Sequence, residues 1–98
     1  MIRDIELAFI KIHILYHADK ENVFGIGLMQ ELAEHGYMIG PGTLYPILNK
    51  LETDGFLVSE KQTVGHKQRK YYTLTGSGKS FLQDMKNKIH ELYMEVFS

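Results

Sequence analysis

Residues 41–57 read PGTLYPILNKLETDGFL, and this stretch decides the fold. Pro41 stands where the first residue of a helix belongs, because the N–H that proline lacks would be unpaired there. Gly55 is typical of a residue that ends a helix. The apolar seam between them recurs at helical spacing and consists of Leu44, Ile47, Leu48 and Leu51. The stretch therefore predicts a helix that is buried along one side.

The face of this helix opposite the seam is polar and carries an internal proline, Pro46. Proline inside a helix normally costs about 3 kcal/mol, and its early position should soften that penalty. Asparagine can pair with an adenine edge, and lysine with phosphate or guanine. A solvated face is the alternative, although proline and an exposed tyrosine are unusual choices for solvation alone. The residues we expect to contact the major groove of DNA are Thr43, Tyr45, Pro46, Asn49 and Lys50.

The segment before this stretch predicts two helices. Apolar residues recur at helical spacing over residues 3–18 and again over 26–35. Gly36 matches the position just after a helix end, and residues 36–40 form a short turn.

The segment after the stretch predicts a hairpin and a long helix. Residues 56–62 and 68–74 form two arms of equal length around a turn at 63–67. The last helix begins near Thr75 or Ser77, either of which can cap it.

Helix, helix, helix, hairpin and long helix make a small α+β pattern that is mostly α, and this order predicts a winged helix-turn-helix. Residues 1–74 would form the DNA-binding domain, with the hairpin as a two-stranded wing. Residues 75–98 would form a C-terminal dimerisation helix, which makes one continuous domain together with the first helix.

The wing is locally basic on a chain whose formal net charge is only −1. A basic spot on a nearly neutral protein indicates a docking surface for a polyanion. A solvated basic loop is the alternative. The wing residues we expect to contact DNA are Gly65, His66, Lys67, Arg69 and Lys70.

The last helix carries more apolar surface than a chain of 98 residues can easily cover by itself, and the first helix offers a second such surface. We expect both surfaces to pack in a homodimer that pairs two wings, although the last helix could instead pack on its own core. The expected dimerisation residues are Ile5, Phe9, Ile12, Tyr16, Leu82, Met85, Ile89, Leu92, Tyr93 and Val96.

His13 and His17 lie four residues apart, a spacing that can bind a divalent metal. Histidines at this spacing are more often surface or interface residues, so we assign no metal site. His35, His66 and His90 form no visible constellation with them. No cofactor motif or catalytic arrangement is apparent, and we expect no enzyme.

Composition limits the class of protein and the cellular compartment that we expect. Hydrophobic residues make up 44% of the chain and charged residues 23%, which is ordinary for a folded domain. Cysteine is absent, so disulfides and thiolate metal sites are excluded. We find no signal peptide and no apolar run long enough to span a membrane, and expect a cytoplasmic protein.

Several fragments together resemble the PadR family of transcriptional regulators. They are Gly42–Leu48, Leu51-Glu52, Gly55–Leu57, Phe24–Ile26, and Tyr71–Thr75 followed by Gly78. The resemblance implies a winged helix-turn-helix, DNA-binding transcriptional regulation (commonly repression) and a homodimer. It is closest to the short form of the family with one C-terminal helix. The absence of tryptophan means that a Trp-lined ligand pocket cannot be transferred.

Two other functions remain open from the sequence. A winged-helix module that docks a protein would suit the nearly neutral charge. The other function is that of a sensor, which releases DNA when it binds a metal or a small-molecule effector of unidentified chemistry. Aromatic residues at the dimer seam are the candidate lining of its pocket.

Overall fold

The computed structural model describes residues 3–98. The first two residues of the predicted DNA-binding domain, 1–74, lie outside the described residues. The elements follow the predicted order and are α1 (Asp4–Lys20), α2 (Gly25–Glu34), α3 (Pro41–Thr53), β1 (Leu57–Val64), β2 (Lys67–Leu74) and α4 (Gly76–Val96). Within residues 3–98, no helix is both long and apolar enough to cross a membrane.

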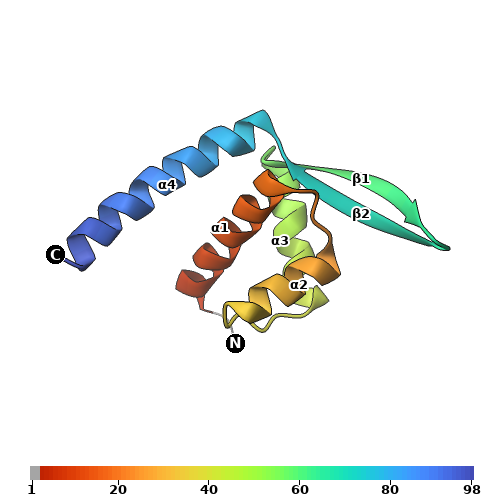
Figure 1. Ribbon diagram of the computed structural model, residues 1–98, viewed down its shortest axis with the longest axis horizontal. Coiled ribbons are helices and arrows are strands. Elements are labelled where there is room, and N and C mark those ends of the chain that lie inside the picture. Colours follow the sequence, from red (N-terminus) through yellow and green to blue (C-terminus); the bar gives the residue numbers. More distant parts are fainter. Residues whose placement is uncertain (1–2) are drawn as a thin grey trace.

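The architecture is the predicted winged helix-turn-helix. Helices α1, α2 and α3 pack into a body, from which the β1–β2 hairpin and α4 project toward opposite ends (Figure 1). The molecule is accordingly elongated, with extents of 53 × 31 × 20 Å. Two long projections from one small body leave much of the hairpin and of α4 without cover from the rest of the chain.

The core lies where the three helices meet the base of the hairpin. Its α3 members are the four residues of the predicted seam, and all four are buried. The remaining buried apolar residues are Ile10, Ile14, Leu15, Ala18, Val23, Leu28, Leu32, Leu57, Tyr72, Leu74 and Leu82. Burial raises the pKa of the Tyr72 phenol above its ordinary value of 10.0, so the ring enters the core uncharged.

Two glycines end helices as the sequence predicts. Gly36 (φ 89°) follows α2 and Gly55 (φ 84°) follows α3, and both adopt the left-handed conformation that glycine tolerates best. After α3, the N–H of Phe56 donates to the carbonyl of Leu51 at 3.0 Å, and that of Gly55 to Glu52 at 3.0 Å. This pair of bonds is the Schellman motif, which satisfies the last helical carbonyls and turns the chain into β1.

The hairpin is longer than predicted. The strands pair from Leu57 opposite Leu74 to Val64 opposite Lys67, so the turn shrinks to Gly65 and His66. Gly65 has φ 64° and His66 does not have a positive φ, as in a type II′ turn, whose twist matches that of the strands. The sequence placed Val64 and Lys67 in the turn because neither residue type marks where a ladder stops.

The base of the wing is tied to the segment before α2. Val23 pairs with Tyr72 as an isolated antiparallel bridge. The N–H of Val23 donates to the carbonyl of Tyr72 at 3.0 Å, and the N–H of Tyr72 donates to the carbonyl of Val23 at 2.7 Å. The start of α2 and the strand β2 are therefore held together by backbone bonds.

Thr75 is the cap of α4, and it also joins that helix to the end of α3. Its hydroxyl accepts from the N–H of Gly78 at 2.9 Å and donates to the carbonyl of Gly55 at 2.6 Å. Gly78 sits so close to the carbonyl of Phe56 and the side chain of Leu74 that a Cβ would overlap both. This junction sets the direction in which α4 leaves the body.

Replacing Gly78 by alanine should therefore destabilise the fold. The added methyl group meets a backbone oxygen that cannot move easily, and overpacking of this kind costs about 1–3 kcal/mol. Urea or thermal unfolding followed by circular dichroism measures the loss. Gly76→Ala is the matched control, because a Cβ there meets nothing within 4 Å and its stability should stay level or rise. Equal effects of the two substitutions would contradict the account of the junction.

Candidate nucleic-acid interface

The outer face of α3 is solvent-exposed along its whole length. All five side chains that the sequence assigned to the major groove are exposed, while the apolar seam behind them is buried. They are Thr43, Tyr45, Pro46, Asn49 and Lys50. The helix thus carries its hydrogen-bonding side chains away from the core, where they can reach another molecule.

Helix α2 approaches α3 closely at one glycine. A Cβ on Gly25 would overlap the hydroxyl of Tyr45, so only glycine leaves room for that ring against the first turn of α2. Tyr45 is 39% exposed, and the hydroxyl end of its ring lies against Gly25. The contact places an exposed aromatic side chain of α3 beside the first turn of α2.

The wing is anchored by one of its own arginines. The guanidinium of Arg69 lies 4.5 Å from the ring centroid of Phe24, just before α2, and the ring of Tyr71 meets Phe24 edge-on at 5.4 Å. Cation–π contacts of this kind contribute about 0.5–1 kcal/mol at exposed sites. Arg69 is therefore half-buried and positioned, whereas Lys67 near the tip is exposed.

The two predicted surfaces meet in one cleft of about 220 Å³. It is lined by Phe24, Gly25, Ile26, Tyr45, Lys67, Gln68, Arg69 and Lys70. Helix α2 begins there without a side-chain cap and without acidic residues in its first turn. The positive end of its dipole and the basic side chains of the wing therefore act together, an arrangement suited to an anion such as phosphate.

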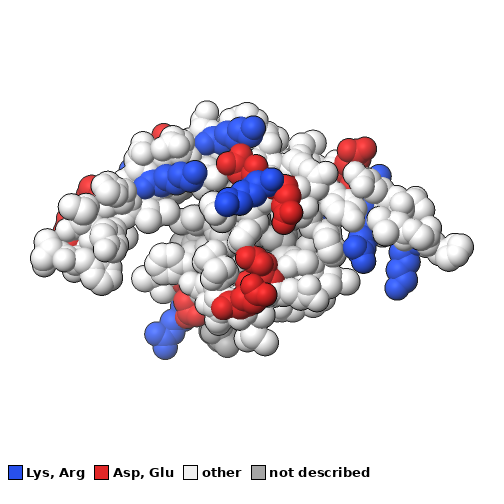
Figure 2. All heavy atoms as spheres, viewed as in Figure 1, with Lys and Arg blue, Asp and Glu red and all other residues white. Residues whose placement is uncertain are grey.

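Basic side chains project from the lower edge of the wing in Figure 2, the side on which α2 lies in Figure 1. The acidic group visible on the wing lies at the upper edge, with a further basic side chain beside it. The wing thus presents positive charge toward the cleft despite the net charge of −1.

Two of the predicted contact lysines are already paired within the chain. Nζ of Lys50 lies 3.0 Å from Oδ1 of Asp54, and Nζ of Lys70 lies 3.8 Å from Oε1 of Glu52. Exposed ion pairs contribute only about 0–1 kcal/mol, so a phosphate can displace either carboxylate at little cost. Glu52 has a second role, since it accepts from the N–H and hydroxyl of Ser59 at 3.1 and 2.6 Å.

Most of the residues assigned to dimerisation are left uncovered by the chain itself. On α4 every residue from Lys86 to Ser98 is exposed, with exposed fractions from 43% at Ile89 to 74% at Phe97 among the apolar ones. Ile5, Phe9 and Tyr16 form an exposed stripe on α1, while Ile12 and Met85 are half-buried. Leu82 differs from the rest: at 2% exposure it belongs to the core of the single chain, and it also lines the groove between α1 and α4.

The sequence shows no constellation that includes His35, whereas the structure brings it to His13 and His17. The rings of His13 and His35 stack with centroids 4.4 Å apart. His35 follows α2 directly, and no periodicity within one segment reveals that the end of α2 crosses α1 at the level of His13.

The sequence reasoning also missed the start of α2 as part of the interface. Phe24, Gly25 and Ile26 line the cleft, although the sequence marks them only through the family resemblance. The available indication was Phe24 at the position just before Gly25, since phenylalanine has no side-chain oxygen to cap the first helical N–H groups.

Comparison with known proteins gives consistent results. The model of the family described as "Transcriptional regulator PadR-like family" matches residues 14–84. Transcriptional regulator Rv3488 of Mycobacterium tuberculosis is 43% identical over 95 residues, which covers 97% of this chain and 89% of the relative.

Solved structures of proteins with similar sequences have the same fold as this chain. A PadR-like transcription factor from Bacteroides fragilis superposes with a TM-score of 0.82 at 33% identity, covering 91% of this chain and 87% of the other. A PadR family transcriptional regulator from Eggerthella lenta gives 0.81 at 35% identity, covering 91% and 79%. The chain therefore belongs to the PadR-like family, and it is a DNA-binding transcriptional regulator with a winged helix-turn-helix fold.

Proposed function

We propose that this regulator binds operator DNA as a homodimer and represses the genes it controls by occupying their operators. Residues 1–74 bind DNA, and residues 75–98 pair two chains together with α1. The observation that carries the proposal is the single cleft in which Tyr45 of α3 meets Lys67, Arg69 and Lys70 of the wing. We assign the chain no catalytic role, in keeping with relatives described as transcriptional regulators.

Helix α3 reads sequence in the major groove. Asn49 is the strongest candidate for base recognition, because its amide can make two hydrogen bonds to an adenine edge. Thr43 and Lys50 flank it with shorter and longer polar side chains, and Tyr45 and Pro46 supply apolar contacts. The exposure of all five supports this role.

The wing and the start of α2 hold the DNA backbone. One phosphate placed in the cleft would face the uncapped N–H groups of α2, with Arg69 and Lys70 alongside. His66 and Gly65 at the tip would follow the neighbouring groove with Lys67. Such contacts add affinity and fix the register of the protein, while sequence preference comes from α3.

Two chains pair through the exposed apolar stripes of α1 and α4. A groove of about 570 Å³ runs between these helices and includes Phe9, Tyr16 and Ile89 in its lining. The α4 helix of a second copy, with its exposed Leu92, Tyr93 and Val96, has matching apolar chemistry. Two-fold pairing would place two α3 helices on half-sites about 34 Å apart, one turn of DNA.

The first experiment is fluorescence anisotropy with duplex DNA from upstream of the protein's own gene. A scrambled duplex serves as the control, and both are measured at two salt concentrations. Tighter binding to the upstream duplex that persists at the higher salt supports an operator-binding protein. Equal binding to both duplexes that disappears at the higher salt contradicts recognition of that operator.

Replacing Asn49 by alanine should weaken binding to the preferred duplex by about 1–3 kcal/mol, because a paired base edge loses its partner. Binding to the scrambled duplex should hardly change, so the specificity ratio falls. Gln83→Ala removes an amide from an exposed position of α4 and should leave both affinities intact. An unchanged specificity ratio in the Asn49 variant would refute base reading by this residue.

The Lys67→Gln/Arg69→Gln double variant should flatten the dependence of log K on log salt by about 2, since about 0.9 is lost per phosphate contact. Lys67→Gln alone isolates the exposed cation, because Arg69 also contacts Phe24 within the chain. Lys79→Gln/Lys88→Gln on α4 removes the same charge and should preserve the slope. A double wing variant with the parental slope would exclude the wing from the interface.

Leu92→Glu should dissociate the dimer, because it buries a charge in the proposed apolar seam. Sedimentation equilibrium would then show a monomer at concentrations where the parent chain is dimeric. Asn87→Glu adds the same charge on the opposite face of α4 and should leave the mass unchanged. A parent chain that stays monomeric at all concentrations would overturn the dimer.

A further inference from the structure

Three imidazoles gather where α1 crosses the end of α2. His13 and His17 lie one helical turn apart on α1, and His35 follows the last residue of α2. One nitrogen of each ring lies within 4.8 Å of a nitrogen of the other two. The rings of His13 and His17 are half-buried, and that of His35 is exposed at the rim. Three potential ligands from two helices thus share one small volume.

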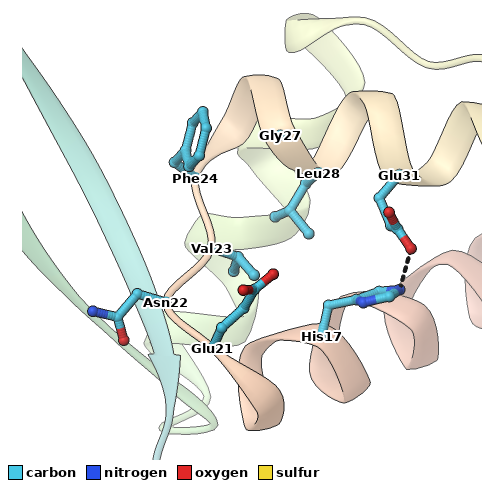
Figure 3. A pocket seen from close by; sticks show the side chains of 8 residues that line it. All are labelled: His17, Glu21, Asn22, Val23, Phe24, Gly27, Leu28 and Glu31. Carbon is cyan, nitrogen blue, oxygen red and sulfur yellow. Dashed lines mark ion pairs between the residues drawn. The ribbon is translucent and has the colours of Figure 1, made fainter.

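A carboxylate completes the group. Oε1 of Glu31, one turn before His35 on α2, lies 3.2 Å from Nε2 of His17 and 3.8 Å from Nε2 of His35. Figure 3 shows Glu31 and His17 facing each other across the gap between α2 and α1. Helix α1 and the C-terminal end of α2 thus contribute two side chains each to one small volume.

Hydrogen bonding within the chain does not account for this arrangement. Nε2 of His17 is buried and makes no hydrogen bond among residues 3–98, although Oε1 of Glu31 lies 3.2 Å away as its ion-pair partner. An unpaired buried polar atom costs about 1–3 kcal/mol. A group bound between the rings would provide the missing partner.

We propose that His13, His17, His35 and Glu31 bind one divalent transition-metal ion per chain, of the class represented by zinc. Three imidazoles and one carboxylate are ligands that suit zinc, nickel, cobalt or copper better than magnesium or calcium. In a tetrahedral zinc site, ligand nitrogens are about 3.4 Å apart. Binding would require side-chain rotation to close the present separation, and His35 is exposed while Glu31 is half-buried.

The position of the ion would make it a clamp between two helices. It would join α1 to the end of α2, the first helix of the helix-turn-helix. The same residues line the groove that also contains Phe9 and Ile89, so the ion would lie beside the proposed pairing surface. An effect on DNA affinity follows only if the proposed function holds, whereas metal binding does not depend on it.

The test is a zinc titration of the full, tag-free chain by isothermal calorimetry, with thermal unfolding as a second measurement. We expect saturation at one ion per chain and a raised Tm, because the ion binds the folded state. Cobalt should give the intense visible absorption of four-coordinate Co²⁺. No saturable binding, or weak binding of several ions per chain, would overturn the proposal.

Variants locate the ion. His35→Gln should abolish the saturable site, and Glu31→Gln should lower affinity by about 10- to 100-fold whether the carboxylate binds the metal or orients an imidazole. His90→Gln, an exposed histidine of α4 outside the cluster, should still bind one ion. His13→Gln gives a second loss of a ligand if His35→Gln does not fold. Parental affinity in a folded His35 or His13 variant would refute the assignment.

DNA affinity measured with and without zinc separates the two proposals. Zinc binding by a chain that shows no preference for any duplex would leave the metal site standing and count against operator recognition. A sequence-specific chain that binds no zinc would do the reverse.

Discussion

The pair of backbone hydrogen bonds between Val23 and Tyr72 is the constraint on which the rest of the interface depends. Through these bonds, β2 is paired both with β1 in the hairpin and with the segment that precedes α2. Tyr72 drives its side chain into the core at the same point, at 1% exposure, so the bridge cannot open without disturbing the core. Arg69 and Phe24 flank the bridge and hold each other. The wing is thus fixed to α2, and the cleft beside α3 keeps its shape.

A protein with a net charge of −1 must bind a polyanion through local charge alone. The bridge makes this feasible, because it places the uncapped start of α2 next to the basic strand of the wing. Two carboxylates close to the predicted contact lysines, Asp54 and Glu52, are paired with Lys50 and Lys70 within the chain. Acidic residues are concentrated instead in residues 1–40, mostly on α1 and α2.

Local interactions explain what could be predicted from the sequence. Gly36, Gly55 and Pro41 mark helix ends by rules that involve only their neighbours along the chain, and the structure confirms all three. Features that depend on contacts between distant segments could not be predicted from the sequence. The burial of Leu82 depends on where α4 crosses the body, and the contact of Arg69 with Phe24 depends on the bridge. The stack of His35 on His13 depends on the crossing of α1 and α2.

Helix α1 shows why one periodic stripe was not enough to describe it. Of the apolar residues that recur at helical spacing, Ile5, Phe9 and Tyr16 are exposed, whereas Leu15 lies in the core with Ile10 and Ile14. Apolar residues on two sides of one helix mean that the chain alone covers only one of them. His13 and His17 lie at the border between the two sides of α1, between the buried Ile14 and the exposed Tyr16. Any change in how α1 sits on α2 would therefore reach the DNA-binding body and the exposed stripe together.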